Sequence, residues 1–120
     1  MVDRVIDGAH VILYSSDAEA DRAFFRDMLQ YPHIDAGGDW LIFKLPPAEL
    51  AVHPADAADR HELYLMCDDL AATIQELSAR GAQIDASITE ARWGRLTTIR
   101  LPGGGTVGLY EPRHERATGL

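Results

Sequence analysis

Four side chains of the types that bind metal ions stand out in the sequence. They are two histidines, His10 and His53, and two glutamates, Glu62 and Glu111. Two imidazoles and two carboxylates in one cavity suit a divalent cation and leave positions open for water or a substrate. Any one of them alone is more simply explained as a capped or solvated residue at a strand end. The metal hypothesis therefore depends on whether the fold brings all four together.

The chain repeats one structural plan twice. Residues 10–17 and 62–69 have equal length, and both run from a strand into an aspartate that caps a helix. Residues 43–54 then match residues 99–112, with two residues inserted at the turn. Each half reads β-α-β-β-β, and such a unit cannot bury the face of its sheet alone. We therefore predict an internal duplication within one domain, which comprises 1–120, with module one at about 8–54, module two at about 61–112 and a short polar C-terminal tail.

The four candidate ligands occupy equivalent positions in these two modules. His10 corresponds to Glu62 at the start of each module's first strand. His53 corresponds to Glu111, and each of these stands one residue before a proline at the end of its module. The repeat thus predicts a symmetric quartet around one centre.

Short β-branched and aromatic runs predict the strands, and aspartates before apolar stripes predict the helices. The first helix follows Asp17 and ends before Pro32; the second follows Asp68 or Asp69 and ends at Gly81. The predicted strands cover 9–15, 40–45, 49–53, 62–67, 95–101 and 106–111, with 82–86 as a short strand or edge segment, and the predicted helices cover 18–30 and 70–81.

Side chains alternate across a strand, which predicts the face that each residue occupies. In the strand 62–67, the leucines should pack on the helices, so Glu62, Tyr64 and Met66 face the opposite, concave side. In the strand 9–15, His10 and Tyr14 face the same side by the repeat. Tyr14 and Tyr64 are candidates to orient a substrate hydroxyl, and packing in the wall of the sheet explains each of them equally well.

Two tryptophans complete the candidate substrate-binding set. Trp40 and Trp93 are predicted to line the mouth of the pocket, together with Met66 inside it. The alternative is that these large aromatic residues belong to the core or to an interface, where they are more often found.

Composition excludes several classes of function. The chain has 120 residues and a formal charge of -8, which argues against binding to nucleic acid or to an anionic membrane surface. The lone cysteine, Cys67, rules out an internal disulfide and favours a reducing cytoplasm. It lies in an apolar run, so we expect a buried, inert thiol rather than a nucleophile. The N-terminus lacks the apolar segment of a signal peptide, and no run is long enough to span a membrane.

The sequence resembles the vicinal oxygen chelate superfamily, which contains glyoxalases, bleomycin-resistance proteins and extradiol dioxygenases. The resemblance rests on HVILYSSDAEADRAFFRDML (10–29), ELYLMCDDLAATIQELSARG (62–81) and LTTIRLPGGGTVGLYEPRH (96–114). It implies an α+β fold in which two β-α-β-β-β modules form an eight-stranded, cup-shaped mixed sheet, with helices on the outer face and a metal at the centre. It also implies a homodimer.

The resemblance implies metal ligands on the first and last strands of each module, which are the positions of the quartet. The glyoxalase I branch has the order His, Glu, His, Glu, whereas this chain has His, His, Glu, Glu. The extradiol dioxygenases place their second histidine where this chain has Glu62. The dioxygenase reaction is therefore the less favoured one.

The quartet predicts a metal-dependent enzyme acting on a small molecule. A divalent ion (Zn, Ni, Fe, Mn or Co) that chelates two neighbouring oxygens of a substrate stabilises an enediolate-like intermediate. Glu111, or Glu62 by symmetry, would act as the base in an isomerase, lyase or epimerase reaction.

Two other functions stay open. The aromatic and methionine side chains of the predicted cup also suit a non-catalytic protein that sequesters a planar small molecule or antibiotic, as bleomycin-resistance proteins do. A regulatory or interaction module with a vestigial cup is the third possibility. The run GGGTVG (103–108) is predicted to be a hairpin turn and no phosphate loop, because strands lie on both sides of it.

Overall fold

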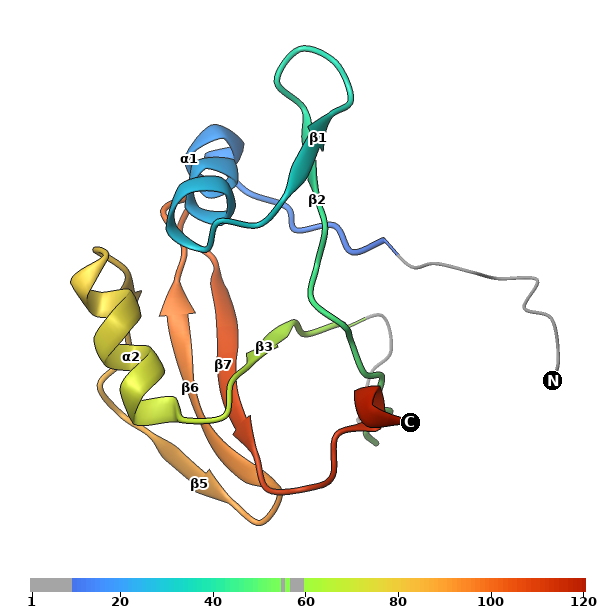
Figure 1. The fold of residues 1–120 in the computed structure, drawn as a ribbon, viewed down its shortest axis with the longest axis vertical. Helices are drawn as coiled ribbons and strands as arrows, with labels where there is room; N and C mark the ends of the chain where they lie inside the picture. Colours follow the sequence, from blue (N-terminus) through green and yellow to red (C-terminus); the bar gives the residue numbers. More distant parts are fainter. Residues whose placement is uncertain (1–9, 55, 57–59) are drawn as a thin grey trace, which may run out of the picture.

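The computed structural model describes residues 10–54, 56 and 60–120. A mixed sheet with helices on one of its faces forms the centre of the α+β fold (Figure 1). Its strands follow the order β3-β7-β6-β4, and β5 pairs with β6. The strands are β3 (Tyr64–Met66), β4 (Gln83–Ile84), β5 (Thr89–Ala91), β6 (Gly94–Arg100) and β7 (Thr106–Pro112).

Module two follows the predicted plan. β3 pairs in parallel with β7, and all other pairs in the sheet are antiparallel. The helix α2 (Leu70–Ala79) begins after Asp69, whose side chain accepts a hydrogen bond from the amide of Ala72 at 3.0 Å. It ends before Gly81, which has a positive φ of 100° as helix ends often require. Strand β5 was not predicted.

Module one contains the predicted helix and one of its three predicted strands. The helix α1 (Ala18–Ala23) is capped by Asp17, as predicted, and continues into a π-helical turn, η1 (Phe24–Met28). A two-stranded ribbon of β1 (His33–Asp35) and β2 (Leu41–Phe43) follows, with a turn between its strands at Gly37 and Gly38. Strand β1 was not predicted.

Two predicted strands of module one are absent from the described residues. Residues 10–15 and 49–53 form no strand and pair with no neighbour. Their apolar side chains are largely exposed, with Tyr14 at 92% and Leu50 at 91%. The sequence pattern suits strands, but a strand needs a partner with which to share its backbone hydrogen bonds. The described chain therefore shows the ribbon and the five-stranded sheet, and the eight-stranded cup is not confirmed.

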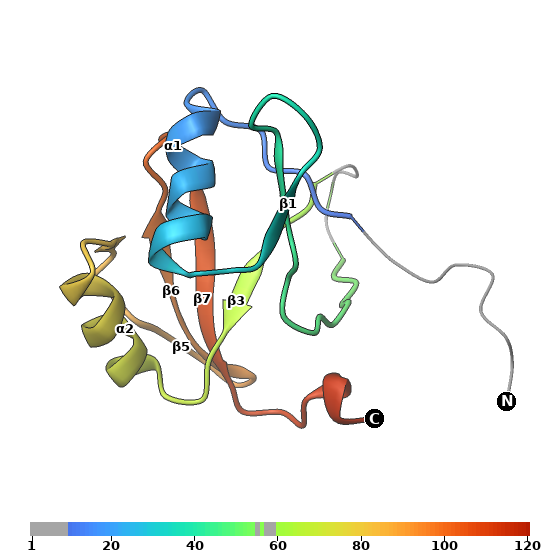
Figure 2. The same ribbon diagram turned by 45° about the horizontal axis from the view of Figure 1, so that its top comes forward.

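The core lies between the helices and one face of the sheet (Figure 2). Leu70 of α2 and Ile99 of β6 are fully buried. Complete burial of such a side chain contributes about 1.5–3 kcal/mol to stability. Both modules supply the core cluster, which comprises Phe24, Phe25, Leu70, Leu77, Ile99, Leu101, Val107 and Leu109.

A buried carboxylate joins α1 to the turn between β6 and β7. Asp21 is 8% exposed, and its Oδ1 accepts a hydrogen bond from the amide of Gly103 at 2.7 Å. A side chain at position 103 would collide with Ser15 and Asp21, so the close approach requires glycine.

Within the described residues, no helix is long and apolar enough to cross a membrane.

Candidate functional site

The face of the sheet opposite α2 is called the open face here. The register places Gly108 between Tyr64 of β3 and Thr98 of β6, so these three residues form one row across the sheet. The next row along contains Met66, Tyr110 and Leu96. Directly paired residues share a face, and Val107 and Leu109 point the other way into the core. The prediction that Tyr64 and Met66 face away from the helices is confirmed.

An aromatic cluster lies on the open face, formed by Tyr64, Trp93, Tyr110 and His114. The ring of Tyr110 is edge-on to Trp93 at 5.3 Å and to Tyr64 at 6.0 Å between centroids. The hydroxyl of Tyr110 shares a hydrogen bond with Nε2 of His114. Tyr110 is 9% exposed, whereas Tyr64 and Trp93 are 36% and 40% exposed. A buried ring is thus flanked by two rings that solvent, or a ligand, can reach.

Tyr64 is held in place from two directions. Its hydroxyl donates a hydrogen bond to Oε2 of Glu62 at 2.7 Å, which raises the pKa of the phenol, and burial raises it further. Its ring lies over Gly108, where any side chain would overlap it. Glu62 also lies 3.6 Å from a guanidinium nitrogen of Arg60. The ring is therefore preorganised on the open face.

A charged clamp holds Trp93 against Tyr110. The amide of Arg113 donates to the carbonyl of Trp93 at 2.8 Å, and Nη1 of Arg113 donates to the carbonyl of Ala91 at 3.1 Å. The carboxylate of Glu90 accepts hydrogen bonds from the guanidinium groups of both Arg113 and Arg95. Partial burial opposes ionisation of Glu90, but the two arginines outweigh it and lower the pKa of Glu90. The turn that carries Trp93 is thereby tied to both of its neighbouring strands.

The predicted ligand Glu111 lies on the face that carries the helices. Its Oε1 accepts a hydrogen bond from the amide of Leu70, the first residue of α2, at 2.9 Å. Glu111 follows Val107 and Leu109 in the alternation of β7, and both of these residues are in the core. Glu111 therefore lies on the core face in this chain, and its role as a metal ligand stays a prediction. A carboxylate at a helix N-terminus satisfies a free amide and interacts favourably with the helix dipole.

The other candidate ligands do not meet at one point. His10 and His53 are exposed and lie outside the strands, and Glu62 is engaged with Tyr64. Among the described residues, no three His, Cys, Asp or Glu side chains are grouped so that they could hold a metal ion. The four side chains are therefore not brought together within this one chain, and the metal stays a prediction from the sequence.

Trp40 and Tyr14 lie away from the aromatic cluster. Trp40 is 64% exposed, beside the ribbon of β1 and β2, with the guanidinium of Arg22 at 4.8 Å over its ring. Tyr14 is almost fully exposed on the segment that forms no strand. Of the predicted substrate-binding residues, the structure brings together Tyr64, Met66 and Trp93 on one face.

Cys67 is partly buried at the end of β3. Its Sγ lies 3.7 Å from the carbonyl of Tyr110. Burial raises the pKa of the thiol, which lowers the fraction of reactive thiolate at neutral pH. This environment agrees with the prediction of an unreactive thiol.

Comparison with solved structures shows several of similar fold. TnmS3, an antibiotic binding protein from Streptomyces, matches with a TM-score of 0.62 at 22% identity, over 92% of this chain and 99% of that chain. A member of the glyoxalase/bleomycin resistance protein/dioxygenase superfamily from Sphaerobacter thermophilus matches with a TM-score of 0.58 at 17% identity, over 89% and 98%. A lactoylglutathione lyase from Agrobacterium tumefaciens matches with a TM-score of 0.55 at 16% identity, over 89% and 95%.

The chain has the vicinal oxygen chelate fold. The resemblance expected from the sequence is thus confirmed at the level of the fold. No protein-family model matches the chain, and no curated protein matches it.

Two residues of the aromatic cluster were missed by the sequence argument. Tyr110 follows from the alternation of β7, in which Gly108 and Tyr110 share the face of Tyr64, whereas His114 lies beyond the end of the strand, where no periodic pattern could place it. The repeat had directed attention to Glu111 instead. In this vicinal oxygen chelate fold, the alternation along the strand was the better guide to the face that each side chain occupies.

Proposed function

We propose that this protein binds a planar, largely apolar small molecule on the open face of the sheet and sequesters it without chemical change. One observation carries the proposal: Tyr64, Trp93 and Tyr110 meet on the face of the sheet opposite the main core cluster. Aromatic pairs of this kind contribute about 0.5–1.5 kcal/mol beyond the burial of their area. The likeness to an antibiotic binding protein, TnmS3, supports the same function.

The rings of Tyr64 and Trp93 are already held in place before any ligand binds. Glu62 fixes Tyr64, and Glu90 fixes the turn that bears Trp93 through Arg113. Rings that are already ordered lose little conformational entropy when a ligand stacks on them. Tyr and Trp supply apolar area together with a polar group, which suits recognition of planar, partly polar ligands.

We further propose that the protein is a homodimer in which residues 10–15 and 49–53 pair with a second copy. Their apolar side chains, such as Ile12 at 62% and Val52 at 88%, are exposed in the single chain. Contiguous exposed apolar segments of this kind mark interfaces. Pairing would also satisfy the backbone groups of both segments.

A metal-dependent isomerase, lyase or epimerase is the second candidate. It is supported by Glu62, whose carboxylate contacts the hydroxyl of Tyr64, and by the likeness in fold to a lactoylglutathione lyase. In that case His10 and His53 would have to reach Glu62 from a rearranged module or from a second copy. Chelator-sensitive ligand binding is the result that would favour this function over sequestration.

Fluorescence titration with methylumbelliferone, a planar aromatic probe, tests the first proposal. We expect micromolar binding that Trp93→Ala abolishes and a chelator leaves unchanged. Trp40→Ala is the matched control, because Trp40 lies away from the aromatic cluster. If Trp40→Ala reduced affinity as much as Trp93→Ala, or if Trp93→Ala had no effect, the open face would not be the binding site.

A further inference from the structure

We propose that a polar groove beside the aromatic cluster binds a neutral, hydroxyl-rich group, such as a sugar ring, attached to the planar part of the ligand. The polar groove is formed by Gln83, Asp85, Thr98, Arg100 and Thr106, and its wall towards α2 is completed by Ser78, Ala82 and Ile84. This inference rests on the proposed function and specifies the ligand class further: a glycosylated, or similarly hydroxylated, aromatic molecule.

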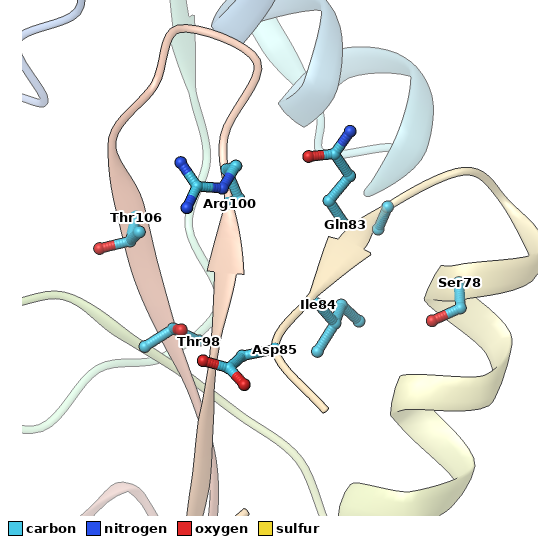
Figure 3. A pocket seen from close by; sticks show the side chains of 8 residues that line it. Ser78, Gln83, Ile84, Asp85, Thr98, Arg100 and Thr106 are labelled. Atoms are coloured by element: carbon cyan, nitrogen blue, oxygen red, sulfur yellow. The ribbon is translucent and has the colours of Figure 1, made fainter. Parts of the chain in front are cut away.

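The groove is a pocket at the β4 edge of the sheet. It has a cavity volume of about 510 Å³ and lies between β4, β6, the start of β7 and the C-terminal end of α2. Figure 3 shows Thr98 and Arg100 on β6, Asp85 directly after β4, and Thr106 on the adjoining strand β7. The register of β4 on β6 pairs Gln83 with Arg100, and the amide of Asp85 donates to the carbonyl of Thr98 at 3.0 Å.

The groove lies at the β4 edge of the sheet, and the part of it formed by Thr98 adjoins the aromatic cluster on the open face. Asp85 lies beside Thr98, Thr98 pairs with Gly108, and Gly108 pairs with Tyr64. Thr98 and Tyr64 are thus two strand spacings apart, which is about 10 Å. Gly108 between them carries no side chain to divide the surface. A ligand with an aromatic ring on Tyr64 therefore reaches Thr98 with a directly attached substituent.

The chemistry of the groove favours a neutral group. Arg100 and Asp85 bring opposite charges that cancel, and neither forms an ion pair with another described residue. The carboxylate of Asp85 accepts the amide of Ser87 through Oδ1 and keeps further acceptor capacity. An anionic ligand group bound to Arg100 would be repelled by the carboxylate of Asp85. A cationic group bound to Asp85 would be repelled by the guanidinium of Arg100.

The groove offers donors and acceptors close together. Gln83 and the two threonines add one amide and two hydroxyls to the charged pair. In the described part of the chain, the side chains of Gln83, Thr98, Arg100 and Thr106 make no hydrogen bond to other residues, so they are available to a ligand. Each hydroxyl of a sugar both donates and accepts, and so matches this mixture.

Paired probes provide the test. Methylumbelliferyl glucoside and methylumbelliferone have the same aromatic ring system and differ by the sugar. We expect the intact protein to bind the glucoside about ten-fold more tightly, the effect of two or three net hydrogen bonds. Thr98→Val and Arg100→Gln should each reduce that preference and leave the affinity for methylumbelliferone unchanged. Arg26→Gln is the matched control, because Arg26 pairs with Asp27 on the exposed side of η1.

The outcomes separate the two proposals. If neither probe binds, the proposed function fails. If both bind equally and the groove variants change nothing, the proposed function stands and the groove inference is overturned. A third probe, methylumbelliferyl sulfate, replaces the sugar by an anion; binding tighter than that of the glucoside would overturn the neutral-group inference in favour of an anion site at Arg100.

Discussion

The ring of Tyr64 occupies the space that a side chain at position 108 would need. Tyr64 and Gly108 are paired in register on β3 and β7, and a Cβ built on Gly108 would overlap the ring carbons of Tyr64. The glycine therefore does more than permit a backbone conformation, since its φ lies in the ordinary range. It allows an aromatic ring to lie on the sheet at the centre of the open face.

Gly108→Ala should displace Tyr64 and weaken binding of a planar probe. The added methyl group forces the ring or the strand to move, which we expect to cost about 1–3 kcal/mol of stability. Urea denaturation and methylumbelliferone titration measure the two effects. Gly105→Ala is the control, because nothing lies within 4 Å of a Cβ at that position. Equal behaviour of the two variants would show that Tyr64 does not need the space over Gly108.

Tyr64 should ionise at a higher pH than an ordinary tyrosine. Its hydrogen bond to Glu62 and its burial raise its pKa above 10.0, so the folded state favours the neutral phenol. The resulting contribution to stability is fully present below the pKa of the unfolded chain and is lost as pH rises through the folded pKa. NMR titration of labelled tyrosines, with Tyr64→Phe for assignment, measures the pKa directly.

Glu62→Gln provides the matched change for this titration. The substitution keeps the size of the side chain but replaces the carboxylate that accepts the hydrogen bond from the hydroxyl of Tyr64. The pKa of Tyr64 should then move down towards its ordinary value. An unchanged titration curve would show that the hydrogen bond between Glu62 and Tyr64 does not form in solution.

Glu111→Gln separates a capping role from a metal-binding role. Loss of the carboxylate at the first amide of α2 should lower stability by about 1 kcal/mol, and the content of bound divalent metal should not change. Chemical denaturation and metal analysis of protein purified without a histidine tag measure the two quantities. Glu115→Gln, on the exposed tail, is the control. A fall in metal content in Glu111→Gln alone would restore Glu111 as a ligand.

The case of Glu111 illustrates what the sequence can and cannot predict. Caps at Asp17 and Asp69 and the alternation in β3 are local patterns, and the structure agrees with them. The quartet relied instead on symmetry between the modules, and symmetry of sequence does not ensure symmetry of side-chain direction. One step along a strand changes the face, which is why Tyr110 and not Glu111 reaches the open face.

The first and last predicted strands of module one are absent for a different reason, whereas the middle one is present as β2. Residues 10–15 and 49–53 have the composition of strands, but pairing depends on a neighbour that the pattern alone does not specify. The short strands β1 and β5 were missed because three residues are too few to establish a period.

Glu90→Gln should loosen the turn that carries Trp93. Both guanidinium groups that bind Glu90 would lose their charged acceptor, so the ring should sample more positions over Tyr110. We expect a few-fold lower affinity for methylumbelliferone and a red-shifted tryptophan emission, recorded in a Trp40→Phe background so that Trp93 alone is observed. Glu76→Gln, which breaks one exposed pair with Arg80, is the control. Unchanged emission would mean that the clamp does not position Trp93.

Val52→Asp should convert the proposed homodimer into monomers. Val52 lies on one of the two unpaired segments and is 88% exposed, so the single chain should tolerate a charge there. A charge buried in an interface would instead cost several kcal/mol, which is enough to dissociate a moderately stable dimer. Analytical ultracentrifugation measures the mass of each variant. Leu120→Asp, at the exposed C-terminus, should leave the dimer intact. A monomeric wild-type protein would show that residues 10–15 and 49–53 do not pair with a second copy.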